Sequence, residues 1–312
     1  MKKRIRKMKN AGWGSPATDT TFLGTSPIEN ALPVQTFSDG KFTIPHGPGI
    51  VNGIVPFPGY LNNPKFPFGS IFPKVAGVYS WMQGDSEENF VKNKDTQSAT
   101  WKYLTKPITY TLNRHGYRAP EWEDIDWKNS VVLFGDSCTY GVGVSDEETI
   151  GFQLAQLLGR PVINLGVGGG SNTLMIHNAT HLLEYFPTPY AVANIWSTTN
   201  RFRFFTEFHT YDAGAWDQNA VKVSEHTNVG KLWELTFADP THELGLAFYE
   251  GKIAKAIWQD RTKYASLSFF GNSAHYTRSD EYFVIDNKAR DLIHPGEESC
   301  REVAQFLYGK FK

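Results

Sequence analysis

The chain has 312 residues, of which 31 are Lys or Arg and 32 are Asp or Glu, so its formal net charge is −1 at pH 7. This length is enough for a full hydrophobic core, and the balanced charge argues against nucleic acid as the main partner. Two cysteines, Cys138 and Cys300, are too few for a disulfide framework, and they indicate a reducing compartment.

The first third of the chain has an unusual composition. Basic residues crowd the first nine positions, but no apolar run follows them, so they do not form a secretory signal. No segment is long and apolar enough to span a bilayer, and we expect a cytoplasmic or virion-associated protein. Residues 1–75 are rich in Pro and Gly yet contain apolar side chains, which predicts an extended arm. The arm would lie on its own domain or on a partner, in a homo-oligomer or a particle.

The rest of the chain divides into a small appended region, 76–128, and an α/β domain, 129–312. Short, continuously apolar runs such as Val131–Phe134 are typical of strands buried on both faces of a parallel sheet. Residues 201–250 are less regular and rich in aromatic side chains, and we interpret them as an insertion over the site. Strands are predicted at 131–134, 161–165, 190–196 and 264–270, and helices at 149–158, 172–185, 241–257 and 297–308. This alternation predicts a three-layer α/β/α sandwich with a mostly parallel, flavodoxin-like sheet.

Two distant segments offer the groups needed for acyl transfer. Phe134-Gly135-Asp136-Ser137 presents a serine hydroxyl at the end of the first strand of this domain. Asp291 and His294 are three residues apart, the spacing of one helical turn, so both can face the same way. Ser137 would attack an ester carbonyl, His294 would take its proton, and Asp291 would orient the imidazole. Because sites in such folds lie at the carboxyl ends of the strands, the segments can share one site.

Other readings of the polar motifs remain open. The glycine run 166–170 after the second strand could instead bind a phosphate at a helix N-terminus, and Asn200 could be an ordinary turn residue. His177 and His181 are four residues apart on a predicted helix, but no third ligand is near in sequence, which favours a packing role over a metal site. Cys138 beside the serine is interpreted as a small packing residue. We therefore predict no metal and no cofactor.

Together these segments resemble the SGNH, or GDSL-type, serine hydrolase family. Gly135-Asp136-Ser137 corresponds to its first motif block, Gly169 to its second, Asn200 to its third and Asp291-x-x-His294-Pro295 to its last. The stretch 113–118 is similar to the segment that precedes the first block in many bacterial members. The resemblance covers residues 108–310 and leaves the N-terminal third unexplained.

The resemblance implies an oxyanion hole and an esterase activity. The backbone N–H groups of Ser137 and Gly169 and the side-chain amide of Asn200 would stabilise the oxyanion. Small acyl esters are the implied substrates, with O-acetyl groups on carbohydrate, such as a polysaccharide, first among them. The chain departs from the family pattern at Cys138, where leucine is usual, and in the third block, where Thr199 replaces the usual glycine before Asn200 and Arg201 replaces the usual aspartate after it. Asp136 and Arg201 are further candidates for binding substrate, and the cation of Arg201 would favour an anionic transition state or an acidic substrate.

Two functions compete with ester hydrolysis. The long arm resembles the draping extensions of assembly subunits, so the chain could be a structural protein, for example a virion component, that uses a hydrolase-like domain as a scaffold or carries an active one to the cell surface. Alternatively, the same catalytic residues could transfer the acyl group to a sugar or lipid hydroxyl, which would make the protein an acyltransferase.

Overall fold

The computed structural model describes residues 55–56, 76–82, 84–205, 209–213 and 240–312. All of them belong to one compact unit that spans 51–217 and 239–312. Nearly all of the predicted arm, 1–75, and much of the predicted insertion, 201–250, lie outside the described residues. No helix within these described ranges has both the length and the apolar character that crossing a bilayer requires.

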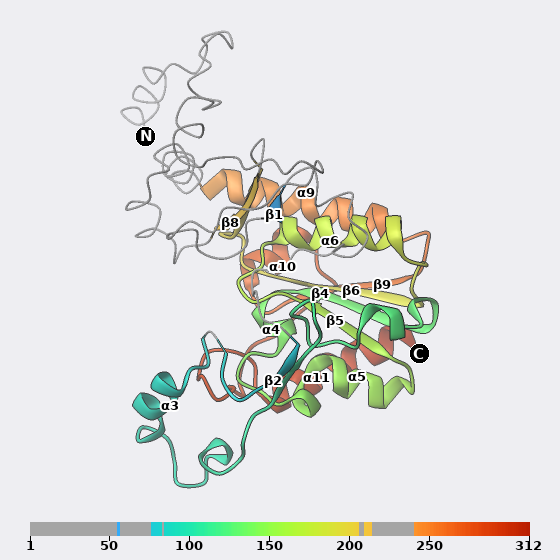
Figure 1. Ribbon diagram of the computed structural model, residues 1–312. Coiled ribbons are helices and arrows are strands. Elements are labelled where there is room, and N and C mark those ends of the chain that lie inside the picture. The colour runs from blue at the N-terminus through green and yellow to red at the C-terminus, as the bar shows by residue number, and fades with distance from the viewer. Residues whose placement is uncertain (1–54, 57–75, 83, 206–208, 214–239) are drawn as a thin grey trace, which may run out of the picture. The chain divides into compact units, whose positions relative to one another are not determined.

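A parallel sheet lies at the centre of the described fold (Figure 1). Its strands are β4 (Val131–Gly135), β5 (Val162–Gly166), β6 (Ala191–Trp196), β9 (Lys263–Ser268) and β10 (Glu281–Tyr282). They are ordered β10-β9-β6-β4-β5, and every neighbouring pair is parallel. Counted along the chain from β4, this is the flavodoxin-like order 2-1-3-4-5, which confirms the predicted fold class. The order reverses at β4, between β5 and β6.

Helices cover both faces of this sheet (Figure 1). On one face, Val132 and Phe134 of β4 share a core with α6 (Asn172–Tyr185) and α9 (Pro240–Trp258). On the other face, Val131 and Leu133 share a core with α5 (Ile150–Leu158) and α11 (Glu297–Phe311). Because successive side chains of a strand point to opposite faces, a strand covered on both sides must be apolar throughout, as the sequence of β4 is.

Local capping residues define the helix ends. The Thr149 side chain accepts a hydrogen bond from the backbone N–H of Phe152 and caps the start of α5, and Gly159 ends that helix in the left-handed conformation, with φ 63°. The Ser171 side chain caps α6 in the same way, through the backbone N–H of Leu174. The short helix α10 (Gly271–Thr277), which follows β9, was not predicted.

The appended region packs against the segment that follows Ser137. Strands β2 (Gly77–Tyr79) and β3 (Tyr110–Leu112) form an antiparallel pair, and α3 (Glu87–Lys94) lies between them in sequence. The core of this region includes Tyr140 and Val142 as well as its own side chains. It therefore shares a core with the α/β domain.

Part of the predicted insertion forms regular structure. Strand β8 (His209–Ala213) lies between β7 (Phe202–Phe205) and β1 (Val55–Pro56), and both pairings are antiparallel. Phe202 is buried and stacks on His242 of α9, so this ring is not available to bind a sugar. Helix α9 begins at Pro240, inside the range 201–250.

Candidate active site

The structure brings Ser137, Asp291 and His294 into contact. The Ser137 hydroxyl lies 2.8 Å from Nε2 of His294. Nδ1 of the same ring is hydrogen-bonded to Oδ2 of Asp291. Ser137 and Asp291 are buried, while the imidazole retains 16 % of its exposure. A hydroxyl, an imidazole and a carboxylate in this order form the arrangement that makes serine a nucleophile.

Ser137 sits at a tight turn between β4 and the four-residue helix α4 (Ser137–Tyr140). Glycine is required at two positions here because the side chain or the backbone of α4 approaches closely. A Cβ at Gly135 would lie 1.8 Å from the Thr139 hydroxyl, and one at Gly166, at the end of β5, would lie 2.4 Å from the backbone nitrogen of Tyr140. These glycines let α4 pack against the ends of two neighbouring strands, which fixes the direction of the serine hydroxyl.

Asp291 and His294 lie in one turn of the loop between β10 and α11, where their side chains meet. Oδ1 of Asp291 accepts hydrogen bonds from the backbone N–H groups of Ile293 and His294, both at 3.1 Å. Leu292, the residue after Asp291, has φ 64°, a left-handed conformation that is strained for a branched side chain. The turn brings the Asp291 carboxylate back toward the His294 ring, so that Oδ2 of the carboxylate reaches Nδ1.

The three proposed oxyanion donors follow three neighbouring strands. Ser137 comes after β4, Gly169 after β5 and Asn200 after β6, and β4 lies between the other two strands. Gly169 has φ 74°, a conformation that favours glycine. The Thr198 hydroxyl donates to Oδ1 of Asn200 at 2.6 Å, so Nδ2 is the end of that amide that can donate to an oxyanion. All three donors belong to the same edge of the sheet.

The two candidates for substrate binding, Asp136 and Arg201, bind each other. The guanidinium of Arg201 lies 2.7 Å from Oδ2 of Asp136, and the Ser197 hydroxyl donates to the same oxygen at 2.9 Å. Oδ1 of Asp136 accepts from the backbone N–H of Cys138. Asp136 is only 1 % exposed, so it joins the turn after β4 to the turn after β6 in place of the substrate contact that we expected.

The remaining titratable candidates from the sequence, Cys138, His177 and His181, all have pKa values shifted toward the neutral form. Burial, and then the Asp136 carboxylate, raise the pKa of the Cys138 thiol, so it does not compete with Ser137 as a thiolate. Burial, followed by the charge of Arg203, lowers the pKa of His177 to about 3. His177 and His181 lie with their Nε2 atoms 3.1 Å apart, and the described residues provide no cluster of three His, Cys, Asp or Glu that would hold a metal with them. The His181 ring also stacks on the Tyr185 ring, with centroids 5.8 Å apart, as a packing role requires.

Similar solved structures include proteins described as members of the G-D-S-L and SGNH families. TesA has a TM-score of 0.37 and 14 % identity, with 59 % of this chain and 98 % of that protein covered. The corresponding values are 0.33, 15 %, 59 % and 96 % for the psychrotrophic esterase EstA from Pseudoalteromonas sp.. They are 0.34, 13 %, 58 % and 65 % for a carbohydrate esterase family 2 enzyme with its carbohydrate binding domain from Corynascus thermopiles. No family model and no curated protein matches the sequence.

The fold is SGNH-like. The strand order of this chain carries that description, together with its serine, glycine and asparagine segments after β4, β5 and β6 and its Asp-x-x-His segment between β10 and α11. With TM-scores of 0.33 to 0.37 and identities of 13 to 15 %, these matches assign no role to any residue of this chain.

Sequence reasoning missed several groups that hold the site of this SGNH-like fold together. Arg118 binds the loop after α4, and Asp85 and Arg290 form a buried ion pair beside Asp291. Glu250 of α9 accepts a hydrogen bond from Thr173 of α6 at 2.5 Å. Arg118 lies in the stretch 113–118, whose resemblance to the family gave it no role, and no periodic or motif signal marks Asp85, Arg290 or Glu250. Each of the four acts through a partner that is distant in sequence.

Glu250 makes the stability of the SGNH-like domain depend on pH. Burial raises its pKa to about 7, from 4.5, against the opposing hydrogen bonds from Thr173 and Asn172. The native state thus holds a proton that the unfolded state releases, so this stability is present below about pH 4.5 and is lost as the pH rises to about 7. Glutamine does not titrate, so Glu250→Gln should remove this loss in the free energy of unfolding, which amounts to about 3 kcal/mol at pH 8.

Thermal melts at pH 5 and pH 8 test this expectation. The variant should melt above the wild type at pH 8, and the difference should shrink at pH 5. Glu302→Gln, on the exposed side of α11, is the matched control, and it should not reproduce this dependence. The same difference at both pH values for Glu250→Gln would contradict the assignment.

Proposed function

We propose that the protein is a serine hydrolase that cleaves carboxylic esters through an acyl-enzyme on Ser137. The observation that carries the proposal is the 2.8 Å contact between the Ser137 hydroxyl and Nε2 of His294, whose Nδ1 is bound to Asp291. These three side chains come from segments more than 150 residues apart, and packing alone gives no reason for them to meet in this order.

The proposed reaction has two halves. In the first, Ser137 Oγ bonds to the ester carbonyl carbon while its proton moves to Nε2 of His294, and the C–O bond to the alcohol then breaks as His294 returns the proton to the leaving oxygen. In the second, His294 takes a proton from water, the resulting oxygen attacks the acyl carbon, and Ser137 recovers its proton as the carboxylic acid leaves. No redox step or co-reactant other than water is needed.

The negative charge on the carbonyl oxygen of each tetrahedral intermediate needs fixed donors. In this proposal they are the N–H groups of Ser137 and Gly169 and Nδ2 of Asn200, which follow β4, β5 and β6. Removing one such donor costs about 3–4 kcal/mol of transition-state stabilisation in other hydrolases. Among substrates we place short acyl esters first, with O-acetyl groups on carbohydrate as the leading class, on the basis of the SGNH resemblance.

A fluorophosphonate probe tests the proposal directly. The probe reacts with activated serines, and mass spectrometry of the labelled wild-type protein is expected to place the adduct on Ser137. Ser137→Ala should remove both the labelling and the cleavage of p-nitrophenyl acetate. Ser145→Ala is the matched control, because Ser145 is also buried but lies in the loop after α4, and it should still be labelled at Ser137. Labelling at another residue, or none, would overturn the proposal.

Transfer to a second acceptor uses the same acyl-enzyme. With an added sugar or lipid alcohol, product analysis separates transfer from hydrolysis: a new ester indicates an acyltransferase, and free acid alone indicates a hydrolase. We expect free acid.

A further inference from the structure

Arg290, the residue before Asp291, is fixed in place by a segment from the appended region. Its Nε lies 2.9 Å from Oδ1 of Asp85, and its NH2 group lies 2.7 Å from Oδ2. The same NH2 group donates to the backbone oxygen of Ser80 at 2.6 Å. The guanidinium also lies over the Trp81 ring, 3.7 Å from its centroid. A two-pronged ion pair of this kind constrains both the position and the orientation of the group that it holds.

A second connection joins Asp85 to the loop after the nucleophile. The Tyr110 hydroxyl donates to Asp85 and accepts a hydrogen bond from the backbone N–H of Gly143 at 2.8 Å. The backbone N–H of Arg290 in turn donates to the carbonyl oxygen of Gly143 at 3.0 Å. Burial, and then the Asp85 carboxylate, raise the pKa of Tyr110, so its hydroxyl keeps the proton that it donates. The peptide groups of Gly143 therefore link the Ser137 side of the site to the His294 side.

The close approach at Gly143 shows how tightly these two loops are joined. Its φ is 80°, and a Cβ there would lie 2.7 Å from the Cβ of Ala289 and 3.2 Å from Oδ1 of Asp291. No side chain fits between the loops at this point. A displacement of residues 289–291 would thus be transmitted directly to the acid of the triad.

The Asp85–Arg290 pair contributes little net free energy to the stability of the fold. Asp85 is 1 % exposed and Arg290 is 4 % exposed, and the desolvation of two buried charges offsets much of their attraction. What such a pair supplies is a defined geometry. The adjacent turn needs one, because Leu292 holds a strained backbone conformation that only surrounding contacts can maintain.

We propose that Asp85 is a positioning residue, which acts through Arg290 to hold the Asp291–His294 turn at hydrogen-bonding distance from Ser137. The inference rests on the proposed function and deepens it. It makes the appended region part of the catalytic apparatus, since the α/β domain alone does not supply the partner of Arg290.

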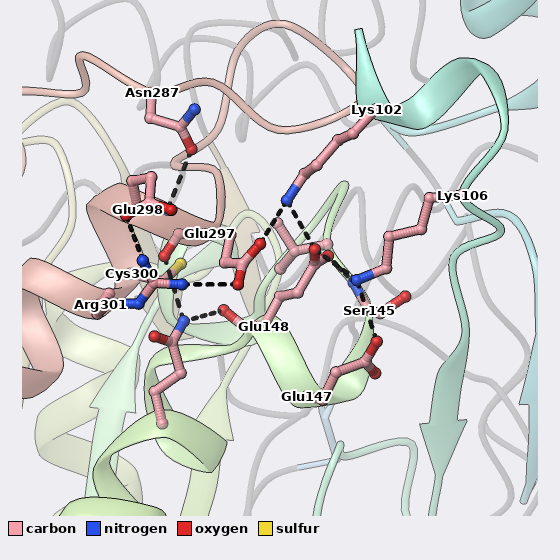
Figure 2. A network of polar contacts seen from close by, with 12 residues as sticks. Lys102, Lys106, Ser145, Glu147, Glu148, Asn287, Glu297, Glu298, Cys300 and Arg301 are labelled. Atoms are coloured by element: carbon pink, nitrogen blue, oxygen red, sulfur yellow. Dashed lines mark hydrogen bonds and ion pairs between the residues drawn. The ribbon is translucent and has the colours of Figure 1, made fainter. Parts of the chain in front are cut away.

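A more exposed contact at the other end of the turn provides a comparison (Figure 2). Lys102, also from the appended region, reaches Glu297 and Glu148, both at 2.7 Å. The Lys102 and Glu297 side chains are 36 % and 31 % exposed, and solvent-exposed ion pairs are weak. Lys102→Met removes this contact, while Glu148 keeps Lys106 as its partner. It is the matched control for the buried pair.

Steady-state kinetics with p-nitrophenyl acetate and the rate of fluorophosphonate labelling test the inference. Asp85→Asn is expected to lower kcat and the labelling rate by about 100-fold, the effect of displacing a reacting group by about 1 Å. KM should stay close to the wild-type value, because no group that contacts substrate has changed. Lys102→Met should keep kcat near that of the wild type. The conservative variant Arg290→Lys should not keep the wild-type geometry of the turn, because an ammonium cannot make the two-pronged contact with Asp85.

A second variant guards against failure to fold. Asp85→Asn combined with Arg290→Met leaves no unpaired buried charge, so this double variant is expected to fold and to show the same loss of kcat. Leu182→Ala, in α6 on the opposite face of the sheet, lowers stability through a cavity and should leave kcat per folded molecule unchanged.

A coupling measurement separates positioning from a general structural role. If Asp85 acts through the acid–base turn, Asp85→Asn should have little further effect on labelling in an Asp291→Asn background. Two results would overturn the inference while leaving the proposed function intact. One is the full 100-fold loss for Asp85→Asn in both the wild-type and the Asp291→Asn background, and the other is wild-type kcat in the Asp85→Asn, Arg290→Met double variant. A wild-type protein that is neither labelled nor active would remove the basis of both.

Discussion

Replacing Asp291 by asparagine is expected to lower kcat for ester hydrolysis by about 10⁴-fold, with little change in KM. The asparagine Oδ1 can still accept from the backbone N–H groups of Ile293 and His294, so the turn is preserved. Its Nδ2, however, would donate to Nδ1 of His294, which forces the imidazole proton onto Nε2. A protonated Nε2 cannot accept the proton of Ser137, and the general base is lost.

Kinetics with p-nitrophenyl acetate measure this effect. Asp286→Asn is the matched control, since Asp286 is an exposed carboxylate a few residues upstream, and the variant should keep wild-type kcat. A crystal structure of Asp291→Asn would show whether the turn survives. If kcat were retained with the turn intact, Asp291 would not be the group that orients His294.

Arg118→Met is expected to reduce the free energy of unfolding by about 3–5 kcal/mol, the cost of breaking a buried charged contact. The Arg118 side chain is 3 % exposed. It donates to the backbone oxygens of Gly141 at 2.6 Å and Val144 at 3.1 Å, and it binds Asp146 at 2.6 Å. Methionine fills much of the same volume but leaves these buried carbonyl groups without their donor.

Chemical denaturation in urea measures the difference. Arg114→Met is the matched control from the same stretch, 113–118, because Arg114 is 54 % exposed and its ion pairs with Glu121 and Glu123 face solvent. We expect this control to change stability by about 0.5 kcal/mol or less. Equal denaturation midpoints for the two variants would show that Arg118 does not hold the loop after α4.

The central layers of the fold could be predicted because their sequence signals are local and strong. Strand β4 is apolar at every position and is buried at every position. Helices α5 and α6 carry capping hydroxyls at Thr149 and Ser171, which are readable without a structure. In contrast, α4 has four residues and β10 has two, which is too short for any periodicity.

The candidate site was only partly readable for a different reason. Ser137, Asp291 and His294 could be selected because their chemistry is distinctive and their segments follow strand ends. Asp85 and Arg290 are 205 residues apart in sequence, and neither lies in a motif. A buried ion pair looks like two ordinary charged residues until the chain is folded, so its position depends on tertiary packing that no local pattern encodes. The Asp136–Arg201 ion pair could not be predicted for the same reason.

The turn that contains Asp291 and His294 has a kinetic consequence. Since the Asp291 carboxylate is bonded both to the imidazole ring of His294 and to that residue's own amide, the acid and the base are assembled with each other before substrate binds. A small movement of this loop would keep the hydrogen bond that sets the imidazole tautomer. It would change only the distance between Nε2 of His294 and the Ser137 hydroxyl. Substrate binding would then need to adjust only this distance. The reaction would depend on the approach of His294 to Ser137, and not also on that of Asp291 to His294.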